Sequence, residues 1–385
     1  MLSQLRRAVM TPWWVAQLFT GTKSFEQNLL IGSRRLNQRG LHAARVAVAH
    51  RLAVARRRKL GRLISGADRE AFDRDGFVVR RNFLPPDEFA ALVAQLKAYR
   101  GPLRDIVEGD TIMRKIALDG HALGRLPALG AVLRSRGWRG LIRYAGARNA
   151  EPVVWVQSIL RHASPGPRDP QTLLHADTFH PTVKAWLFLT DVAEDAGPFT
   201  YVPGSHRLTA RRLAWEKRMS LDARHSPNAE IRQGSPRIDE DDLAGLGLPP
   251  PRAFAVPANT LVVADTFGFH ARGPSAGASL RVEIWAYGRR SPFLPWSALL
   301  PWTTAALGRR SVLSWKFDDL LEKAGLKKNR WRARHGVSAF DPPSGDDAAA
   351  DRNGLAVGDD HGGQRDRGKS GHSAVPSRVP GAPVS

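Results

Sequence analysis

Two histidines and one aspartate, placed in two separated segments, most constrain what this chain can fold into. His175 and Asp177 stand two residues apart in LLHADTFH, and His270 ends the segment VVADTFGFH. Residues i and i+2 of a β-strand project to the same face, so His175 and Asp177 would converge there. Two imidazoles and one carboxylate can hold a ferrous ion on one face and leave the opposite face open. The pattern therefore predicts neighbouring strands around a metal site.

An HxD pair alone is a weak signal, because any two polar residues on one strand face match it. Two other histidines compete for the ligand role. His180 would fall on the opposite strand face, and His206 belongs to the turn-forming segment PGSH. Proline fixes one backbone angle of that segment and glycine permits an unusual one, so we read it first as a turn. We expect both histidines to face solvent or to form hydrogen bonds rather than bind metal.

An arginine follows the third ligand at a useful distance. Arg281 lies eleven residues after His270 and opens the β-like run RVEIWAYG. Its planar guanidinium suits the far carboxylate of an organic cosubstrate. Arg272 is the alternative, but it lies in RGPSAG, which we expect to be a loop. With the three ligands, Arg281 indicates an oxygen-activating iron site that uses 2-oxoglutarate.

Three segments, in this order, resemble the phytanoyl-CoA dioxygenase family. Together they span residues 71–291, and any one of them alone would be a modest signal. They are AFDRDGFVVRRNFLPPDEFAALVAQL, HADTFHPTVKAWLFLTDVAEDAGPFTYVPGSHR and DTFGFHARGPSAGASLRVEIWAYG.

The resemblance implies roles for individual residues. The implied Fe(II) ligands are His175, Asp177 and His270, and the implied 2-oxoglutarate ligand is Arg281. Three further residues would line the cosubstrate pocket: Trp186, Ile159 and Lys115. Simple core packing is the alternative for Trp186 and Ile159, because such side chains on strands are more often buried than functional.

The resemblance also implies the chemistry. Reaction with dioxygen would drive the oxidative loss of carbon dioxide from 2-oxoglutarate and leave succinate and an oxidant. This oxidant would remove hydrogen from a nearby C–H group and return hydroxyl. In halogenating relatives a small residue replaces the ligand carboxylate. Since Asp177 is present here, we expect hydroxylation.

The predicted fold is mainly β with flanking helices: a double-stranded β-helix, or jelly roll, with a basic helical N-terminal extension. Short β runs separated by turns support this class. We expect them at 153–160, 172–177, 183–192, 199–204, 253–267 and 280–288, after an entry strand at 77–80, a helix at 87–99 and helix-rich cover up to residue 150. We divide the chain into a basic amphipathic helical extension (1–66), the dioxygenase domain (67–290), a Trp-rich basic apolar segment (291–340) and a disordered tail (341–385). The polar insertion at 211–251 is placed to form a lid.

Composition limits the location of the protein. The chain has no cysteine, which excludes disulfides and thiolate metal sites and fits a reducing compartment. No secretory signal is recognisable, and no segment approaches the ~18 uninterrupted apolar residues of a membrane span. We therefore expect a cytoplasmic protein, peripheral on the inner face of the membrane if its basic ends bind lipid.

The net charge of +22 is concentrated at the N-terminus, where residues 1–66 hold thirteen Lys or Arg and one acidic residue. A helix is expected over 41–64, with an apolar stripe of Leu41, Val48, Leu52 and Ala55. Trp13 and Trp14 precede it, and residues 291–317 add three tryptophans. Arginine and tryptophan together suit an anionic membrane surface. Packing of the helix on its own core is the second reading, and nucleic-acid binding ranks last.

Three functions follow from these observations. The first is hydroxylation of an organic substrate, such as a lipid or lipid-linked group at a membrane surface. The second is a cytosolic hydroxylase of a small metabolite or natural product. The third is a non-catalytic membrane or nucleic-acid adaptor with a decayed dioxygenase fold, against which the intact ligand set argues.

Overall fold

The larger of two β-sheets has eight strands, each antiparallel to its neighbours. The computed structural model describes residues 2–161, 169–288, 290–294 and 303–343. In spatial order the strands of the large sheet are β1 (Phe77–Arg80), β8 (Thr260–Asp265), β5 (Val183–Phe188), β10 (Ser279–Gly288), β4 (Val153–Arg161), β3 (Thr111–Ala117), β2 (Leu103–Glu108) and β11 (Arg332–Arg334).

The smaller sheet packs against β1, β8 and β5, at one end of the large sheet. It consists of β7 (Arg252–Ala253), β6 (Phe199–Tyr201) and β9 (His270–Arg272), and an isolated bridge to His270 adds His175 at its edge. Side chains of both sheets pack in one apolar cluster that includes Trp186, Phe188, Phe199 and Tyr201. Two antiparallel sheets closed over a shared interior confirm the predicted jelly roll.

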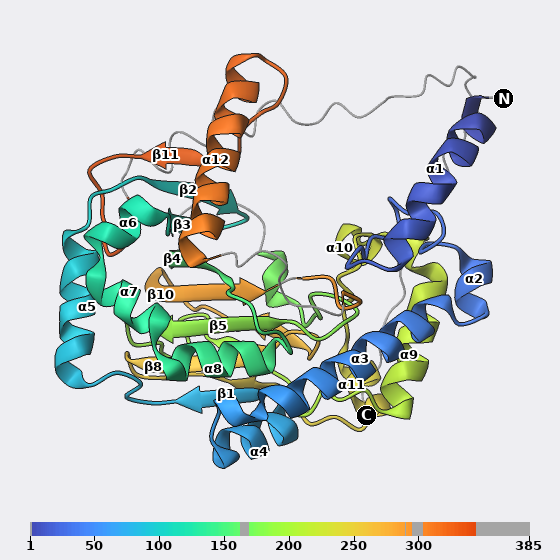
Figure 1. Cartoon of the computed structure of the whole chain (residues 1–385), viewed down its shortest axis with the longest axis horizontal. Helices are drawn as coiled ribbons and strands as arrows, with labels where there is room; N and C mark the ends of the chain where they lie inside the picture. The colour runs from blue at the N-terminus through green and yellow to red at the C-terminus, as the bar shows by residue number, and fades with distance from the viewer. Residues whose placement is uncertain (1, 162–168, 289, 295–302, 344–385) are drawn as a thin grey trace, which may run out of the picture. The chain divides into compact units, whose positions relative to one another are not determined.

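Helices cover the outer face of the large sheet (Figure 1). These are α4 (Gly66–Asp75), α5 (Pro86–Ala98), α6 (Gly120–Arg125), α7 (Pro127–Arg134) and α8 (Arg136–Ala145). Their apolar residues share the largest core cluster with outward-facing residues of the sheet, such as Val282 and Ile284 of β10. The side chains of β10 therefore divide by strand alternation, with Val282 and Ile284 on the helix side and Arg281 and Glu283 on the barrel side.

The hairpin of β2 and β3 corrects the sequence-based reading, which placed only helical cover between the first helix and residue 150. A two-residue loop, Gly109 and Asp110, joins these strands, and Gly109 has a φ of +61°. Glycine at the first loop position is typical of a tight hairpin turn. The Gly-Asp dipeptide between two β-rich runs was the available signal. The hairpin matters because β3 carries Lys115.

The N-terminal extension contains α1 (Leu2–Leu18), α2 (Arg34–Gln38), α3 (Leu41–Leu60) and the 3-10 turn η1 (Gly61–Leu63). The predicted apolar stripe of α3 was wrong, since Val48 is 44% exposed and Ala55 is also exposed. The buried face is instead formed by His42, Arg45, Val46, Ala49, His50 and Ala53.

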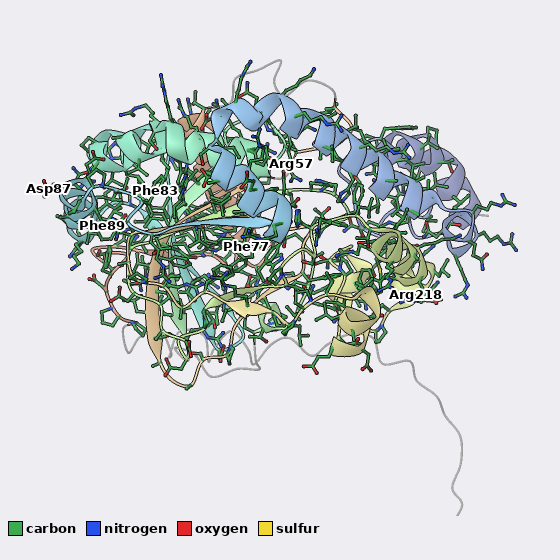
Figure 2. All side chains as sticks on the ribbon, turned by 90° about the horizontal axis from the view of Figure 1, so that it is seen from below. Arg57, Phe77, Phe83, Asp87, Phe89 and Arg218 are labelled. Carbon is green, nitrogen blue, oxygen red and sulfur yellow. The ribbon has the colours of Figure 1, made fainter. Side chains whose placement is uncertain are left out.

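Two polar residues of the buried face of α3, His42 and Arg45, have hydrogen-bond partners, which lowers the cost of burying them. Arg45 donates hydrogen bonds to the carbonyl oxygens of Leu18, Thr20 and Thr22. Arg57 on the same helix, labelled in Figure 2, forms an ion pair with the fully buried Asp265 at 2.7 Å. Helix α3 is therefore a packed part of the catalytic fold.

The insertion at 211–251 is largely helical, and its role as a lid stays a prediction. It contains α9 (Ala210–Asp222), η3 (Ala223–His225), α10 (Ala229–Arg232) and α11 (Glu240–Leu246). Its middle returns to the metal-binding segment, where the Ala176 amide donates to the Pro236 carbonyl and the Ile238 amide donates to the Leu174 carbonyl. Residues 172–177 were expected as a strand and instead form bridges only at His175, beside the short turn η2 (Pro170–Thr172).

The C-terminal part continues from the barrel into α12 (Thr304–Lys323) and β11. Among the described helices, none combines the length and apolar character that crossing a membrane would require. Residues up to Pro343 form one compact unit, and the predicted internal boundaries at 66, 290 and 340 stay predictions. The predicted disordered tail lies, from residue 344 on, outside the described residues.

Candidate metal centre

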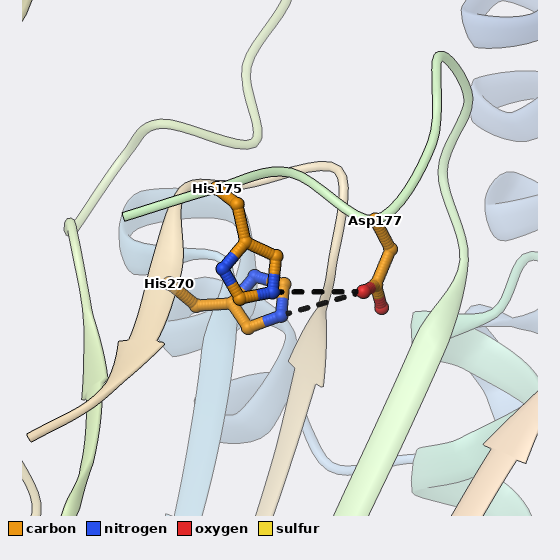
Figure 3. A group of neighbouring side chains, drawn as sticks. All are labelled: His175, Asp177 and His270. Atoms are coloured by element: carbon orange, nitrogen blue, oxygen red, sulfur yellow. Dashed lines mark ion pairs between the residues drawn. The ribbon is translucent and has the colours of Figure 1, made fainter. Parts of the chain in front are cut away.

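The structure brings His175, Asp177 and His270 together in the barrel interior (Figure 3). One ligand atom of each residue lies within 4.8 Å of the others, and all three side chains are buried. The Nε2 atoms of His175 and His270 are 3.9 and 3.8 Å from the same Asp177 oxygen, Oδ1. This is the donor set that was predicted, two imidazole nitrogens and one carboxylate, and it fits a ferrous ion.

Both imidazoles are held in the tautomer that a metal ligand needs. Nδ1 of His175 lies 2.8 Å from the Leu173 carbonyl oxygen, and Nδ1 of His270 lies 2.9 Å from the Gly268 carbonyl oxygen. A carbonyl can only accept, so Nδ1 carries the proton and Nε2 presents its lone pair. Burial is the main cause that lowers the pKa of His175 well below its usual value and that of His270 to about 4. Both rings are therefore neutral near pH 7.

Lys184 is a fourth residue of this centre, and the sequence reading missed it. Its Nζ lies 2.9 Å from Oδ1 and 2.8 Å from Oδ2 of Asp177, and 3.5 Å from Nε2 of His270. The ammonium thus pairs with the carboxylate that a divalent cation would bind. Strand alternation was the available signal, because Lys184 and the predicted Trp186 are two residues apart on one face of β5.

Arg237 is a second residue that the sequence reading missed. It forms a bridge with His175 from the insertion, and its positive charge contributes to the low pKa of both histidines. Nη1 donates to the Ser235 carbonyl, while Nε has no hydrogen-bond partner among the described residues. No spacing rule links residue 237 to the HxD pair, so only the fold could reveal it.

Arg281 lies on β10, opposite Ile159 of β4 in the strand register. Its Nη1 donates to the Gly197 carbonyl at 2.6 Å, and its Nε lies 2.9 Å from Oε2 of the buried Glu283. Gln157 donates to the other oxygen of Glu283 at 2.8 Å. The carboxylate of Glu283 therefore offsets part of the positive charge of Arg281, a pairing that the sequence did not indicate.

The remaining predicted pocket residues lie on the same inward face. Trp186 is buried and packs against Phe199, with ring centroids 4.2 Å apart and the ring planes tilted by 32°. Ile159 is buried in a small cluster with Ile106 and Met113. The Lys115 ammonium lies 4.7 Å from the ring centre of Trp285, and burial lowers its pKa to about 8. The packing of Trp186 and Ile159 agrees with a core role as well as with a pocket wall.

The competing residues lie elsewhere. His180 is buried, with Nδ1 2.9 Å from the Pro181 carbonyl, and His206 packs edge-on against Phe72. Neither belongs to the cluster that can hold a metal. Arg272 was expected in a loop, which was wrong. It lies in β9 and forms an ion pair with the fully buried Asp169.

Comparison with known proteins agrees with the sequence resemblance. The sequence model of the phytanoyl-CoA dioxygenase (PhyH) family matches residues 72–238. Residues 72–238 belong to the phytanoyl-CoA dioxygenase family. The matched segment contains His175 and Asp177, and the geometry of the folded chain adds His270. The chain is accordingly an iron- and 2-oxoglutarate-dependent oxygenase.

Solved structures resemble the chain more distantly. The epimerase SnoN in complex with Fe3+, alpha ketoglutarate and nogalamycin RO is 20% identical, with a TM-score of 0.38, over 60% of this chain and 82% of SnoN. HygX from Streptomyces hygroscopicus with nickel and 2-oxoglutarate is 16% identical, with a TM-score of 0.37, over 58% and 87%. EctD from S. alaskensis with bound Fe is 19% identical, with a TM-score of 0.35, over 58% and 76%. A search of curated proteins gave no match.

The buried neutral histidines predict acid sensitivity of the metal-free protein. Burial lowers the pKa of His180 to about 4 and that of His206 to about 3, against 6.5 for an ordinary histidine. The unfolded chain therefore takes up these protons at higher pH than the folded chain. Stability should be full above pH 6.5 and fall as the pH decreases from 6.5 toward 4, by up to about 1.4 kcal/mol per pH unit for each such histidine.

Urea unfolding in a chelating buffer at pH 7.5 and pH 5.5 measures this effect. His180→Gln should reduce the loss between the two pH values, whereas substitution of the exposed His121 by Gln should leave it unchanged. Equal losses in all three proteins would contradict the assignment.

Lys184 predicts an effect on metal affinity. Because its ammonium competes with a cation for the Asp177 carboxylate, Lys184→Met should tighten Mn²⁺ binding by about tenfold or more. Calorimetric titration with Mn²⁺ measures the change, and Lys59→Met, at an exposed site of α3, is the charge-matched control. Weaker binding to Lys184→Met would instead show that the ammonium supports the metal-bound state.

Proposed function

We propose that this protein hydroxylates an organic substrate, with His175, Asp177 and His270 as the Fe(II) ligands and 2-oxoglutarate as cosubstrate. The observation that supports this most is the buried triad, in which both histidine Nδ1 atoms are bonded to backbone carbonyls. When bound, iron would react with 2-oxoglutarate and dioxygen to supply an oxidant that hydroxylates a C–H bond; one oxygen atom of dioxygen goes to succinate, the other to the product, and carbon dioxide is released. The presence of Asp177 favours hydroxylation over halogenation.

In this proposal the chain's own residues bind and orient the cosubstrate. Arg281 binds its far carboxylate, with its guanidinium held in place by Gly197 and Glu283. Glu283 offsets part of the positive charge of Arg281. Lys115 adds a second positive charge near Arg281 that can attract the cosubstrate. Trp186 and Ile159 form apolar walls that exclude water. Arg237 and Lys184 hold positive charge at the metal end.

A cavity of about 590 Å³ lies at the ends of β4, β5 and β10 and is our candidate for the substrate site. It is lined by Trp155, Trp315 and Trp331 and by Tyr287, which pairs with Lys184 in the strand register. Lys184 contacts Asp177, so the Lys184 side chain lies between Tyr287 in the cavity wall and the metal ligands. The aromatic lining suits a substrate with a sizeable apolar part.

Anaerobic addition of Fe(II) and 2-oxoglutarate, followed by air, tests the proposal. The wild-type protein should bind both and release succinate, and His175→Ala should lose both signals. Arg281→Gln should raise the KM for 2-oxoglutarate by about tenfold or more, because a charge-assisted contact to its carboxylate is lost. Arg81→Gln, at an exposed position just after β1, is the control. Absence of succinate from wild type would favour the non-catalytic adaptor.

We further propose that the enzyme works at an anionic membrane surface. On α12 the side chains of Leu313, Phe317 and Leu320 are 54%, 59% and 61% exposed and share one helical face. Exposed Arg309 and Lys316 flank them. Trp13 of α1, 59% exposed, adds an indole. Apolar residues beside basic ones suit the boundary between headgroups and acyl chains.

The packing of α3 limits which part of the chain could bind a membrane, and it supports the alternative of a cytosolic hydroxylase. Because α3 buries one face on the catalytic fold, it is not an independent membrane anchor, and the second reading, a cytosolic hydroxylase of a small metabolite, accounts for this part of the extension. Deletion of residues 1–66 would remove α3 and expose the surface of the catalytic fold that α3 covers. Point substitutions on α12 are therefore the appropriate test.

Phe317→Ser with Leu320→Ser should lower binding to phosphatidylglycerol vesicles by about tenfold or more, because two exposed apolar side chains can no longer insert. Co-sedimentation of the full chain measures it. Leu326→Ser removes a leucine that is 75% exposed but lies beyond α12, and should have little effect. Equal sedimentation of all three proteins, or none of the wild type, would favour the cytosolic alternative.

A further inference from the structure

A second, strongly basic cavity lies away from the metal centre. It has a volume of about 1000 Å³ and lies between α3, α4 and the turn that follows the PGSH segment. We call it the arginine groove, after its lining residues Arg51, Arg57, Arg58, Arg69 and Arg207. None of the three metal-binding residues lines it.

The positive charge of this groove is largely uncompensated. Asp73 is the one acidic residue among the lining residues, and its carboxylate accepts a hydrogen bond from the Tyr144 hydroxyl. Arg57 forms an ion pair with Asp265 and donates hydrogen bonds to the Tyr144 and Ala145 carbonyl oxygens. Within the described parts of the chain, the other four arginines form no ion pair. Four guanidinium groups without acidic partners around one cavity repel each other unless an anion joins them.

Two buried histidines in the wall carry further polar atoms without partners. His50 is 8% exposed, and its Nε2 has no hydrogen-bond partner within the described residues. His206 is 6% exposed, and its Nδ1 likewise has none there. A buried polar atom without a partner costs free energy, so such atoms call for an explanation. Burial and then the charge of Arg57 lower the pKa of both rings, so they stay neutral and can donate an N–H.

We propose that the arginine groove binds a phosphate-bearing anion. Arginine presents a planar fork of donors that matches phosphate oxygens, and here the forks come from three separate elements. A single carboxylate would pair with one or two of them and leave the rest unpaired. A phosphate group carries more charge and three oxygens, so it can join α3 to α4 and to the turn at Arg207. Neutral His50 supplies an additional donor in the wall.

The ligand chemistry is the same for a soluble phosphate ester and for an anionic lipid headgroup. The groove is separate from the triad, so binding there and turnover at the metal centre are distinguishable. A bound anion would also stabilise the fold, since it binds only where α3 is docked against α4.

Calorimetric titration of the full chain with inorganic pyrophosphate, beside co-sedimentation with vesicles of phosphatidic acid in phosphatidylcholine, tests the proposal. Arg51→Gln with Arg58→Gln should weaken binding by about tenfold or more, because two charge-assisted contacts are lost. Arg69→Gln with Arg207→Gln, on the other side of the groove, should do the same. Arg35→Gln with Arg39→Gln removes equal charge from exposed positions on and next to α2 and should leave the affinity unchanged. All these side chains are exposed, and thermal unfolding without ligand checks that each variant is folded.

Each outcome decides the matter. Loss of pyrophosphate binding in both groove variants, but not in the control, supports a site for soluble phosphate esters. If the wild-type protein binds only the phosphatidic acid vesicles, and both groove variants but not the control lose this binding, the ligand is a lipid headgroup. Equal weakening in the control means that net charge alone attracts the anion and overturns the proposal, as does failure of the wild-type protein to bind either probe. None of these readouts needs iron or 2-oxoglutarate, so they stand apart from the test of the proposed reaction.

Discussion

The metal centre depends on a reciprocal pair of backbone hydrogen bonds. The His175 amide donates to the His270 carbonyl at 3.0 Å, and the His270 amide donates back to the His175 carbonyl at 2.9 Å. This pairing joins segments almost a hundred residues apart and places two imidazoles with ring centroids 4.4 Å apart. The Asp177 amide, bonded to the Thr266 carbonyl at 2.9 Å, fixes the third ligand relative to the same strand connection. Everything proposed about the chemistry follows from this closure of the smaller sheet.

Around that closure, the barrel interior is rich in charge rather than uniformly apolar. Lys184 pairs with Asp177 at one end, and Arg281 pairs with Glu283 at the other. Buried charges are tolerated when each has a partner of opposite charge or forms hydrogen bonds. Such an interior suits a reaction whose cosubstrate is a dianion, because incoming carboxylates meet donors that are already in position.

The excess positive charge of the chain is used in more than one way. Inside the fold, Arg45 and Arg57 of α3 donate hydrogen bonds to carbonyl oxygens, and Arg57 also forms an ion pair with Asp265. Arg51 and Arg58 of the same helix stay exposed and line the arginine groove. Helix α3 therefore holds the extension on the barrel with one face and presents positive charge to solvent with the other. The two sets of arginines point in different directions because an α-helix has 3.6 residues per turn.

The sequence by itself determined the candidate ligand types and the jelly-roll class, because residue type, strand alternation and the HxD spacing are local properties. The strand that it predicted at 172–177 was wrong, since only isolated bridges form there, at His175. The sequence also located the entry strand, whose bounds coincide with β1. It misplaced the buried face of α3, because average hydrophobicity cannot show that Arg45 and His42 find partners across the fold. The contact of Lys184 with Asp177 and the position of Arg237 beside His175 were decided only by tertiary structure, since each joins segments that the fold brings together. Glu283 and Arg281 lie on one strand, but their pairing depends on the burial of both side chains, because a buried charge left unpaired is costly.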